Sequence, residues 1–475
     1  MKRLFENPNS QLLGIGVFFL LLYIICYPTN ILIFDEWKYF QQGLAYSLGD
    51  PLLQEADPLL LSIEARTPGH YPLGTPFFLA TLISLLGKKA VFLQGLISLL
   101  GAFYFNIKTL KNLNMDSRFS LLLFFFFPTT LLSMTLMSDL PSLFMVSWFL
   151  YLITRTNKTK LSILGAGFIG GLSILFREPN ILLILPFLIG LYSRDNLKLF
   201  ISGIAGFFIA VMLRLGTSFW AFGNPFFIKD SGVSFSIQYF IENAIFYSPF
   251  LVIFVPAGLW ALYKYNDMFK LEIKLSLILF LGLYFLYGYN GTHFSGVKSI
   301  ILGPRFLIPT LPFFSIVLAR LCETELKFIR KMLIPVSISC ILGTQIVGYY
   351  YNLEQQKAFL GLENKHNKIH LIAEVNTIPK ILFPSNDNFL KIYVEDSLMI
   401  EKIIKRDTFI YVETSFRDDT ELANNFSSIA NQRLDRLLQG YEGKETFKYT
   451  LPDNIIIRQY VFFDKDVVPS PSKLN

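Results

Sequence analysis

Long apolar runs alternate with short charged connections over the first three quarters of the chain. They recur from Leu12 to about Tyr351, and the charged residues are confined to the gaps between them. A helix needs about 20 apolar residues to cross a bilayer, and it satisfies its own backbone hydrogen bonds there. The pattern predicts a polytopic α-helical membrane protein.

The expected membrane helices number about eleven, with ends uncertain by a few residues. The first covers Gln11 to Phe34, which is too long for a signal-peptide core. The others are expected at 90–107, 119–137, 140–154, 161–176, 180–193, 198–219, 247–264, 273–289, 304–320 and 332–351. The apolar stretch 73–87 is treated separately.

The basic residues of the short connections set the orientation. With a cytoplasmic N-terminus, every basic cluster faces the cytoplasm, as the positive-inside rule requires. These clusters contain Lys108, Lys111 and Arg118; Arg155, Lys158 and Lys160; Arg194 and Lys198; Lys264 and Lys270; Arg320, Lys327, Arg330 and Lys331. Counting 73–87 as a span would invert them, so we expect an interfacial helix there. The protein is then a multi-pass inner membrane protein whose C-terminus lies outside the cytoplasm.

Composition excludes several function classes. Hydrophobic residues make up 53% and charged residues 16% of the chain, which excludes an ordinary soluble enzyme. The net charge of +7 is explained by the cytoplasmic connections, so it does not indicate nucleic acid binding. The three cysteines lie in or beside apolar runs and offer no disulfide framework. A Gly-rich phosphate loop is missing from the sequence, which argues against nucleotide-driven transport.

Two polar regions complete the predicted organisation. The first is the outer loop 35–89, which we assign to a membrane domain covering residues 1–352. The second is the tail 353–475, with β-like runs beginning at Lys391, Thr408 and Asn454 and a helix-like stretch near 418–438. It predicts a small extracytoplasmic α/β domain.

The outer loop holds the first candidate chemistry. Asp35 and Glu36 directly follow the first span, where partial burial can make a carboxylate a better base. An interfacial anchor beside Trp37 is the alternative explanation, and taken on these residues alone it is the more common one. Arg66, His70 and Tyr71 are candidate substrate-binding residues, with His70 a candidate ligand for a phosphate or hydroxyl, although a lone histidine is more often structural.

Further charges recur where other spans reach the same outer side. Asp139 follows one such span in Ser138-Asp-Leu-Pro, where helix capping is the alternative explanation. Arg177, His293, Lys298 and Arg305 are candidates for binding a lipid phosphate. Anchoring of lipid headgroups would explain any one of these cations taken singly.

Together these motifs resemble the GT-C superfamily of glycosyltransferases, nearest to bacterial protein O-mannosyltransferase-like and lipid A aminoarabinose transferase-like proteins. The similarity rests on Phe-Asp-Glu after the first span, Pro-Gly-His-Tyr-Pro before the interfacial helix, Ser-Asp-Leu-Pro, and Gly-Pro-Arg-Phe-Leu-Ile-Pro. It covers about residues 1–350, and it depends on the order and common sidedness of motifs that are individually unspecific.

This resemblance implies transfer of a sugar from a polyprenyl phosphate to a lipid, glycan or protein acceptor, with inversion. It places Asp35 as the base or acceptor-binding carboxylate with Glu36 beside it, Asp139 as the second acidic residue and Arg305 at the donor phosphate. Members differ in metal dependence, so a divalent metal stays open and no other cofactor is expected. A departing polyprenyl phosphate is already a stabilised anion, so one carboxylate and a few cations would suffice.

Four other functions remain alternatives. A secondary transporter would need charges or broken helices near the bilayer midplane, whereas the charges here cluster at span ends. A flippase, or a polysaccharide polymerase or ligase, would share the lipid-linked substrate. A purely structural membrane subunit is the remaining alternative.

Overall fold

The structure is a computed structural model, and it describes residues 7–31, 34–49, 72–194, 197–226, 234–288, 303–325 and 327–363, with five strands beyond residue 370. The chain divides into two compact units. Unit 1 comprises Met1–Tyr27, Tyr39–Pro51 and Pro68–Gly348, and unit 2 comprises Pro28–Lys38, Leu52–Thr67 and Tyr349–Asn475. The expected domain boundary after residue 352 lies close to the division between Gly348 and Tyr349. Unit 2 also includes Pro28–Lys38 and Leu52–Thr67, so it groups part of the outer loop with the tail.

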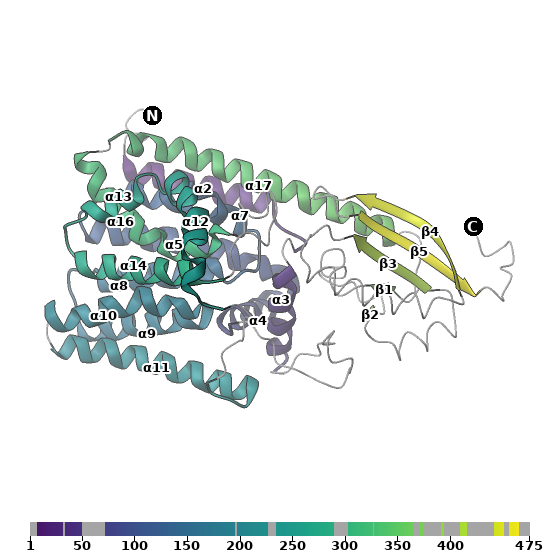
Figure 1. Ribbon diagram of the computed structural model, residues 1–475, viewed down its shortest axis with the longest axis horizontal. Helices are drawn as coiled ribbons and strands as arrows, with labels where there is room; N and C mark the ends of the chain where they lie inside the picture. The colour runs from purple at the N-terminus through teal and green to yellow at the C-terminus, as the bar shows by residue number, and fades with distance from the viewer. Residues whose placement is uncertain are drawn as a thin grey trace. The chain divides into compact units, whose positions relative to one another are not determined.

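Helices make up most of the described chain (Figure 1). Those of the first half are α2 (Pro8–Ile25), α3 (Phe34–Ser47), α4 (Gly74–Leu86), η1 (Lys88–Phe92), α5 (Leu93–Asn112), η2 (Ser117–Leu121), α6 (Leu122–Phe125), α7 (Phe127–Leu132), α8 (Asp139–Ile153), α9 (Lys160–Phe176), η3 (Glu178–Asn180) and α10 (Ile181–Arg194). The second half holds α11 (Leu197–Phe222), η4 (Ile237–Tyr239), α12 (Phe240–Phe254), α13 (Gly258–Lys264), α14 (Lys270–Leu286), η6 (Pro304–Thr310), α16 (Leu311–Thr324) and α17 (Lys327–Glu363).

Six helical stretches are long and apolar enough to cross a membrane: Pro8–Ile25, Lys88–Asn112, Leu197–Trp220, Ile237–Phe254, Pro304–Glu323 and Lys327–Lys357. Shorter apolar helices cover Gly74–Leu86, Asp139–Ile153, Lys160–Phe176 and Glu178–Tyr192. The predicted helical membrane architecture is therefore confirmed. The count of about eleven spans, and the interfacial position expected for 73–87, stay predictions.

Proline interrupts three of the expected spans. The first helix ends at Ile25, before Pro28, and does not continue to Phe34. The stretch 119–137 is divided among η2, α6 and α7, with Phe126 extended ahead of Pro128. Helices α12 and α13 are separated around Pro256. Proline lacks the N–H that a helix requires, and its ring clashes with the preceding turn, which explains why these spans are broken.

Unit 1 is built from closely packed helices. Helix α9 packs against both α8 and α11, and α5 packs against α8. A Cβ atom on Gly167 of α9 would overlap the carbonyl of Gly203, and one on Gly206 of α11 would overlap that of Leu164. Glycine at these positions therefore allows the two helix backbones to approach, as small residues do between membrane helices.

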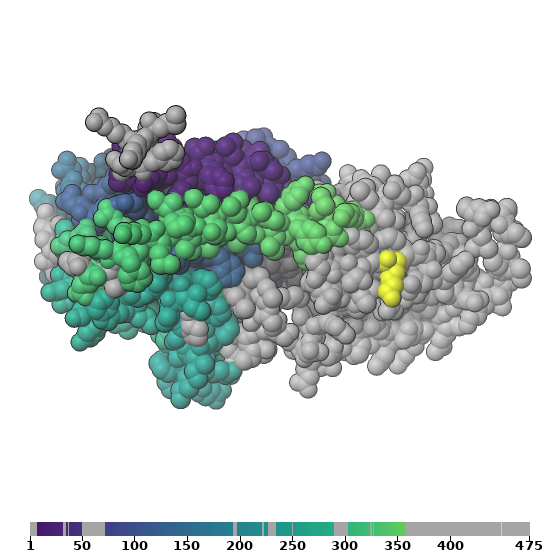
Figure 2. All heavy atoms as spheres, turned by 90° about the horizontal axis from the view of Figure 1, so that it is seen from above, coloured from purple at the N-terminus to yellow at the C-terminus, as the bar shows by residue number. Residues whose placement is uncertain are grey.

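Helices α2 and α17 lie side by side in both views of the molecule (Figures 1 and 2).

Part of the surface of unit 1 is apolar, as expected for a surface that lipid would cover. Helix α11 exposes large apolar side chains, including Ile201, Phe208 and Met212. By contrast, η6 and α16 are largely buried, with Phe313 and Phe314 fully enclosed.

Unit 2 contains a five-stranded mixed sheet in the order β2-β1-β3-β5-β4. Its strands are β1 (Leu371–Ala373), β2 (Lys391–Tyr393), β3 (Phe409–Ser415), β4 (Tyr441–Thr450) and β5 (Ile456–Asp464). The pairs β1–β2 and β1–β3 are parallel, and β3–β5 and β4–β5 are antiparallel. The β-like runs expected at 391, 408 and 454 coincide with β2, β3 and β5, whereas the helix-like stretch 418–438 lies outside the described residues.

Candidate functional site

Three predicted site residues of unit 1 lie at neighbouring helix ends. Asp139 is in the first turn of α8, and Arg177 directly follows α9. A six-residue connection joins these helices, so they run antiparallel and bring the start of α8 to the end of α9. Arg305 lies in η6, which also packs against α8.

Asp139 and Arg177 form an ion pair in which the carboxylate is buried and the guanidinium is partly buried. Nη1 of Arg177 donates to Oδ1 of Asp139, and the exposed fractions of the two side chains are 12% and 1%, respectively. Ser138 precedes the helix without a side-chain capping bond, so the ion pair rather than capping accounts for Asp139. Breaking a buried ion pair leaves an uncompensated charge, which makes the two residues a unit.

The turn that carries Arg177 is fixed by a buried asparagine. Nδ2 of Asn180 donates to Oγ of Ser142 at 2.8 Å and to the carbonyl of Ser173 at 2.9 Å. Since Ser142 belongs to α8 and Ser173 to α9, Asn180 joins η3 to both helices. Arg177 is therefore tied to the same two helices, because its side chain pairs with Asp139 of α8 and its backbone directly follows α9.

Phe306 brings the two arginines together. The guanidinium carbon of Arg177 lies 4.9 Å from the centre of the Phe306 ring, and that of Arg305 lies 5.1 Å from it. Tyr284 stacks on the same ring at 5.2 Å and 19°. Arg305 is itself buried, at 7% exposure. Cation–π contacts strengthen when they are removed from water, so this environment stabilises two neighbouring cations.

We call Asp139, Arg177, Arg305 and Phe306 the arginine cluster. Its ionisable side chains carry two positive charges and one negative charge, so the cluster favours an anion. A phosphate suits it well because guanidinium groups can donate two parallel hydrogen bonds to phosphate oxygens.

Tyr247 of α12 is a site residue that the sequence did not reveal. Its side chain is fully buried, its hydroxyl makes no hydrogen bond, and it interacts electrostatically with both Arg177 and Arg305. A buried hydroxyl normally has a partner, and leaving it without one is costly. Tyr247 therefore offers a donor to a ligand at the arginine cluster.

Asp35 and Glu36 lie in the first turn of α3 and belong to unit 2. Glu36 is fully buried, whereas Asp35 is only partly buried. Both carboxylates are placed where a helix N-terminus favours negative charge. Asp35 is the more accessible of the two to a substrate.

The other predicted binding residues cannot be placed. Arg66, His70, Tyr71, His293 and Lys298 lie outside the described residues, and their roles stay predictions. Among the residues that the structure does describe, no group of three or more histidine, cysteine, aspartate or glutamate side chains could hold a metal ion.

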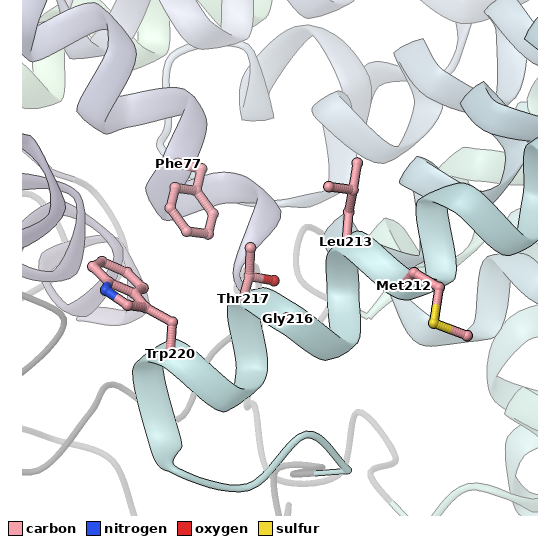
Figure 3. Close-up of a pocket in the computed structure, with 6 residues that line it drawn as sticks. All are labelled: Phe77, Met212, Leu213, Gly216, Thr217 and Trp220. Atoms are coloured by element: carbon pink, nitrogen blue, oxygen red, sulfur yellow. The ribbon is translucent and has the colours of Figure 1, made fainter.

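An apolar groove of about 350 Å³ runs between α4 and α11 (Figure 3). Its lining consists of Phe77, Met212, Leu213, Gly216, Thr217 and Trp220. Tyr46 of α3 closes this region by stacking on Phe77 at 4.7 Å and packing against Trp220 at 5.2 Å. The groove therefore presents apolar and aromatic atoms to an occupant.

A second ion pair connects this groove to the arginine cluster. Arg214, which follows groove residue Leu213 on α11, donates through Nη2 to Oε1 of Glu178 at 3.3 Å. Glu178 is the residue next to Arg177. Arg214 is thus next in sequence to a residue of the groove, and its partner Glu178 is next in sequence to a residue of the arginine cluster.

Comparisons with known proteins identify the fold. No family model and no curated protein matches the sequence. The crystal structure of ArnT from Cupriavidus metallidurans bound to undecaprenyl phosphate matches with a TM-score of 0.59 and 12% identity, over 94% of this chain and 97% of that one. The structure of the same protein in the apo state matches with a TM-score of 0.55 and 11% identity, over 94% and 98%. The chain therefore has the fold of ArnT, which confirms the predicted resemblance at the level of architecture.

Proposed function

We propose that this protein is a membrane glycosyltransferase that uses a polyprenyl-phosphate sugar donor and inverts the anomeric carbon. The arginine cluster is the observation that carries the proposal. It is a buried, net positive group at adjacent helix ends, in a fold shared with a protein crystallised with undecaprenyl phosphate. The acceptor is a lipid, a glycan or a protein on the extracytoplasmic side.

The proposed reaction needs few protein groups. The acceptor hydroxyl oxygen attacks the anomeric carbon while the bond from that carbon to the donor phosphate oxygen breaks. Asp35 takes the hydroxyl proton, and polyprenyl phosphate leaves as an anion. Arg305 and Arg177 stabilise the charge that grows on the phosphate, and Asp139 holds Arg177 in place. Glu36 supports Asp35, and Arg66, His70, Tyr71, His293 and Lys298 are proposed to contact substrates.

The orientation also follows from the positive-inside rule. Asp139 begins α8 and Arg177 follows α9, whereas the basic connection 155–160 lies at the opposite ends of these helices. A cytoplasmic connection therefore puts the arginine cluster on the outer side of the inner membrane.

The proposal is tested with purified protein in nanodiscs, supplied with synthetic polyprenyl-phosphate sugars and with an extract of the host's envelope lipids and glycans. The glycan lost on gene deletion identifies the acceptor to use. We expect release of polyprenyl phosphate and appearance of a glycosylated product with inverted configuration. Movement of the intact donor between the leaflets of sealed proteoliposomes, without any transfer, would instead support a flippase.

Tyr247→Phe is expected to weaken donor use without changing the fold. The variant removes only a hydroxyl that makes no hydrogen bond within the protein. If that hydroxyl donates to the donor phosphate, its loss should lower kcat/KM for the donor about tenfold, which corresponds to about 1.4 kcal/mol. Steady-state kinetics with varied donor measures this change. Tyr104→Phe, on the exposed side of α5, is the control.

The groove between α4 and α11 is proposed to hold the polyprenyl chain of the donor. It is apolar, open to the surface and joined to the arginine cluster through Arg214 and Glu178. Each buried methylene contributes about 0.8 kcal/mol, so a groove of this size can supply much of the affinity for a long prenyl chain.

Gly216→Leu tests this placement. A Cβ atom at Gly216 would meet no other atom within 4 Å, so leucine can enter the groove without disturbing the backbone. We expect donor KM to rise about tenfold with little change in kcat, because binding of the unreactive chain is lost. The effect should fade with short-chain donors. Gly14→Leu, another exposed glycine with an open Cβ position, is the matched control. A rise in acceptor KM alone would assign the groove to the acceptor.

A further inference from the structure

Amide side chains near the end of α17 bind the segment that leads into α3. The backbone N–H groups of Thr29 and Asn30 both donate to Oδ1 of Asn352, at 3.2 and 2.9 Å. Asn30 and Asn352 are buried, at 5% and 2% exposure. One side-chain oxygen therefore accepts from two successive backbone groups more than 300 residues away in sequence.

Two further amides of the same helix act on this segment. Nε2 of Gln355 donates to the carbonyl of Ile31 at 3.0 Å, and Nε2 of Gln356 donates to Oγ1 of Thr29 at 2.5 Å. Gln355 and Ile31 are both buried. We call Asn352, Gln355 and Gln356 the amide clamp.

The segment needs such partners because it has no secondary structure of its own. Residues 27–31 are neither helix nor strand, so their buried backbone groups must bond to something else. Pro28 prevents continuation of α2, and the clamp fixes residues 29–31 beyond it. The clamp and Asp35 belong to the same unit, and Asp35 follows Ile31 by only four residues.

We propose that the amide clamp positions Asp35, and that Asn352 is a positioning residue for the carboxylate that accepts the proton. This inference rests on the proposed function. A small displacement of a reacting group can lower the rate about a hundredfold. A catalytic carboxylate that follows a segment without secondary structure therefore needs partners that hold this segment in place. Helix α17 continues to Glu363 and is followed by β1, so the helix that leads to the C-terminal sheet also binds residues 29–31.

The test combines transfer kinetics with hydrogen exchange of the purified full-length protein in nanodiscs. In Asn352→Leu the side chain keeps its approximate size but loses the acceptor. We expect kcat to fall at least about tenfold, donor KM to stay within about twofold, and amide exchange to rise in residues 28–38. Asn352→Asp keeps the accepting oxygens and should recover most of kcat. If Asn352→Leu does not fold, Gln356→Ala, at a half-buried position, should give a smaller change of the same kind.

Gln345→Leu is the matched control. Gln345 is another buried amide of α17, but its Nε2 donates to Thr130 and Ser133 and not to residues 28–38. Its loss should leave kcat and exchange in 28–38 near wild type. Wild-type kcat in a folded Asn352→Leu variant, or equal losses in both variants, would overturn the inference. If wild-type protein transfers no sugar, the proposed function fails. Increased hydrogen exchange confined to residues 28–38 in Asn352→Leu would then still show that the amide clamp holds this segment. If that increase is also absent, both the proposed function and the clamp are rejected.

Discussion

Asp35→Asn is expected to fold normally and to transfer sugar at least about a hundredfold more slowly than wild type. The amide keeps the shape of the carboxylate but cannot accept a proton from the acceptor hydroxyl. Asp35 is partly exposed in the first turn of α3, so its replacement should disturb little packing. Donor binding should be retained because the donor phosphate is assigned to other residues.

Single-turnover transfer with bound donor measures this effect, since it separates the chemical step from binding and product release. Glu36→Gln is the matched comparison. Glu36 is fully buried beside Asp35, so the change should reduce the rate less than Asp35→Asn does and should act mainly on stability. A folded Asp35→Asn protein with wild-type turnover would remove Asp35 from catalysis.

The sequence indicated that Asp139, Arg177 and Arg305 share one surface because these three residues follow a one-dimensional rule. Asp139, Arg177 and Arg305 each occur where an apolar stretch begins or ends on the same predicted side. Helices that cross a layer in alternating directions bring such positions to one surface. Their order in the sequence was therefore enough to indicate that they share a surface.

The specific side-chain contacts of the site could not be predicted from the sequence because they depend on packing between elements that are distant in the chain. Phe306 reads as an ordinary apolar-span residue, and only its packing reveals that both arginines contact its ring. Tyr247 likewise reads as apolar, and only its burial without a hydrogen-bond partner singles it out. Asn352 is separated from Asn30 by most of the chain. The breaks at Pro28, Pro128 and Pro256 did carry a local signal, since proline ends helices, but hydropathy alone joins the flanking apolar residues into one span.

The pairing of Asp139 changes how the two arginines are expected to behave. Part of the charge of Arg177 is balanced by Asp139 in unit 1. Arg305 lies against the same Phe306 ring, and we propose that it makes the main interaction with donor phosphate. A guanidinium held against an aromatic ring is also preorganised, which favours stabilisation of the transition state over ground-state binding.

Arg305→Ala is expected to lower kcat by about 10²- to 10³-fold, as removal of a preorganised charge-stabilising group commonly does. Arg305→Lys should lower it about tenfold, because lysine keeps the charge but loses the bidentate geometry. The loss should appear in turnover as well as in donor KM, since the charge on the phosphate oxygen grows as the glycosidic bond breaks. The cation–π contact with Phe306 contributes only about 2 kcal/mol, so the fold should survive.

The measurement is sugar transfer from a synthetic polyprenyl-phosphate donor in nanodiscs, with folding checked by thermal unfolding of each variant. Lys198→Ala is the control, because Lys198 is an exposed cation near the start of α11, at the end predicted to be cytoplasmic. That change should leave the rate near wild type. Equal rates for wild type and folded Arg305→Ala, at limiting and at saturating donor, would exclude the phosphate-binding role. Since the arginine cluster carries the proposed function, that result would also weaken the proposal that this protein uses a polyprenyl-phosphate donor.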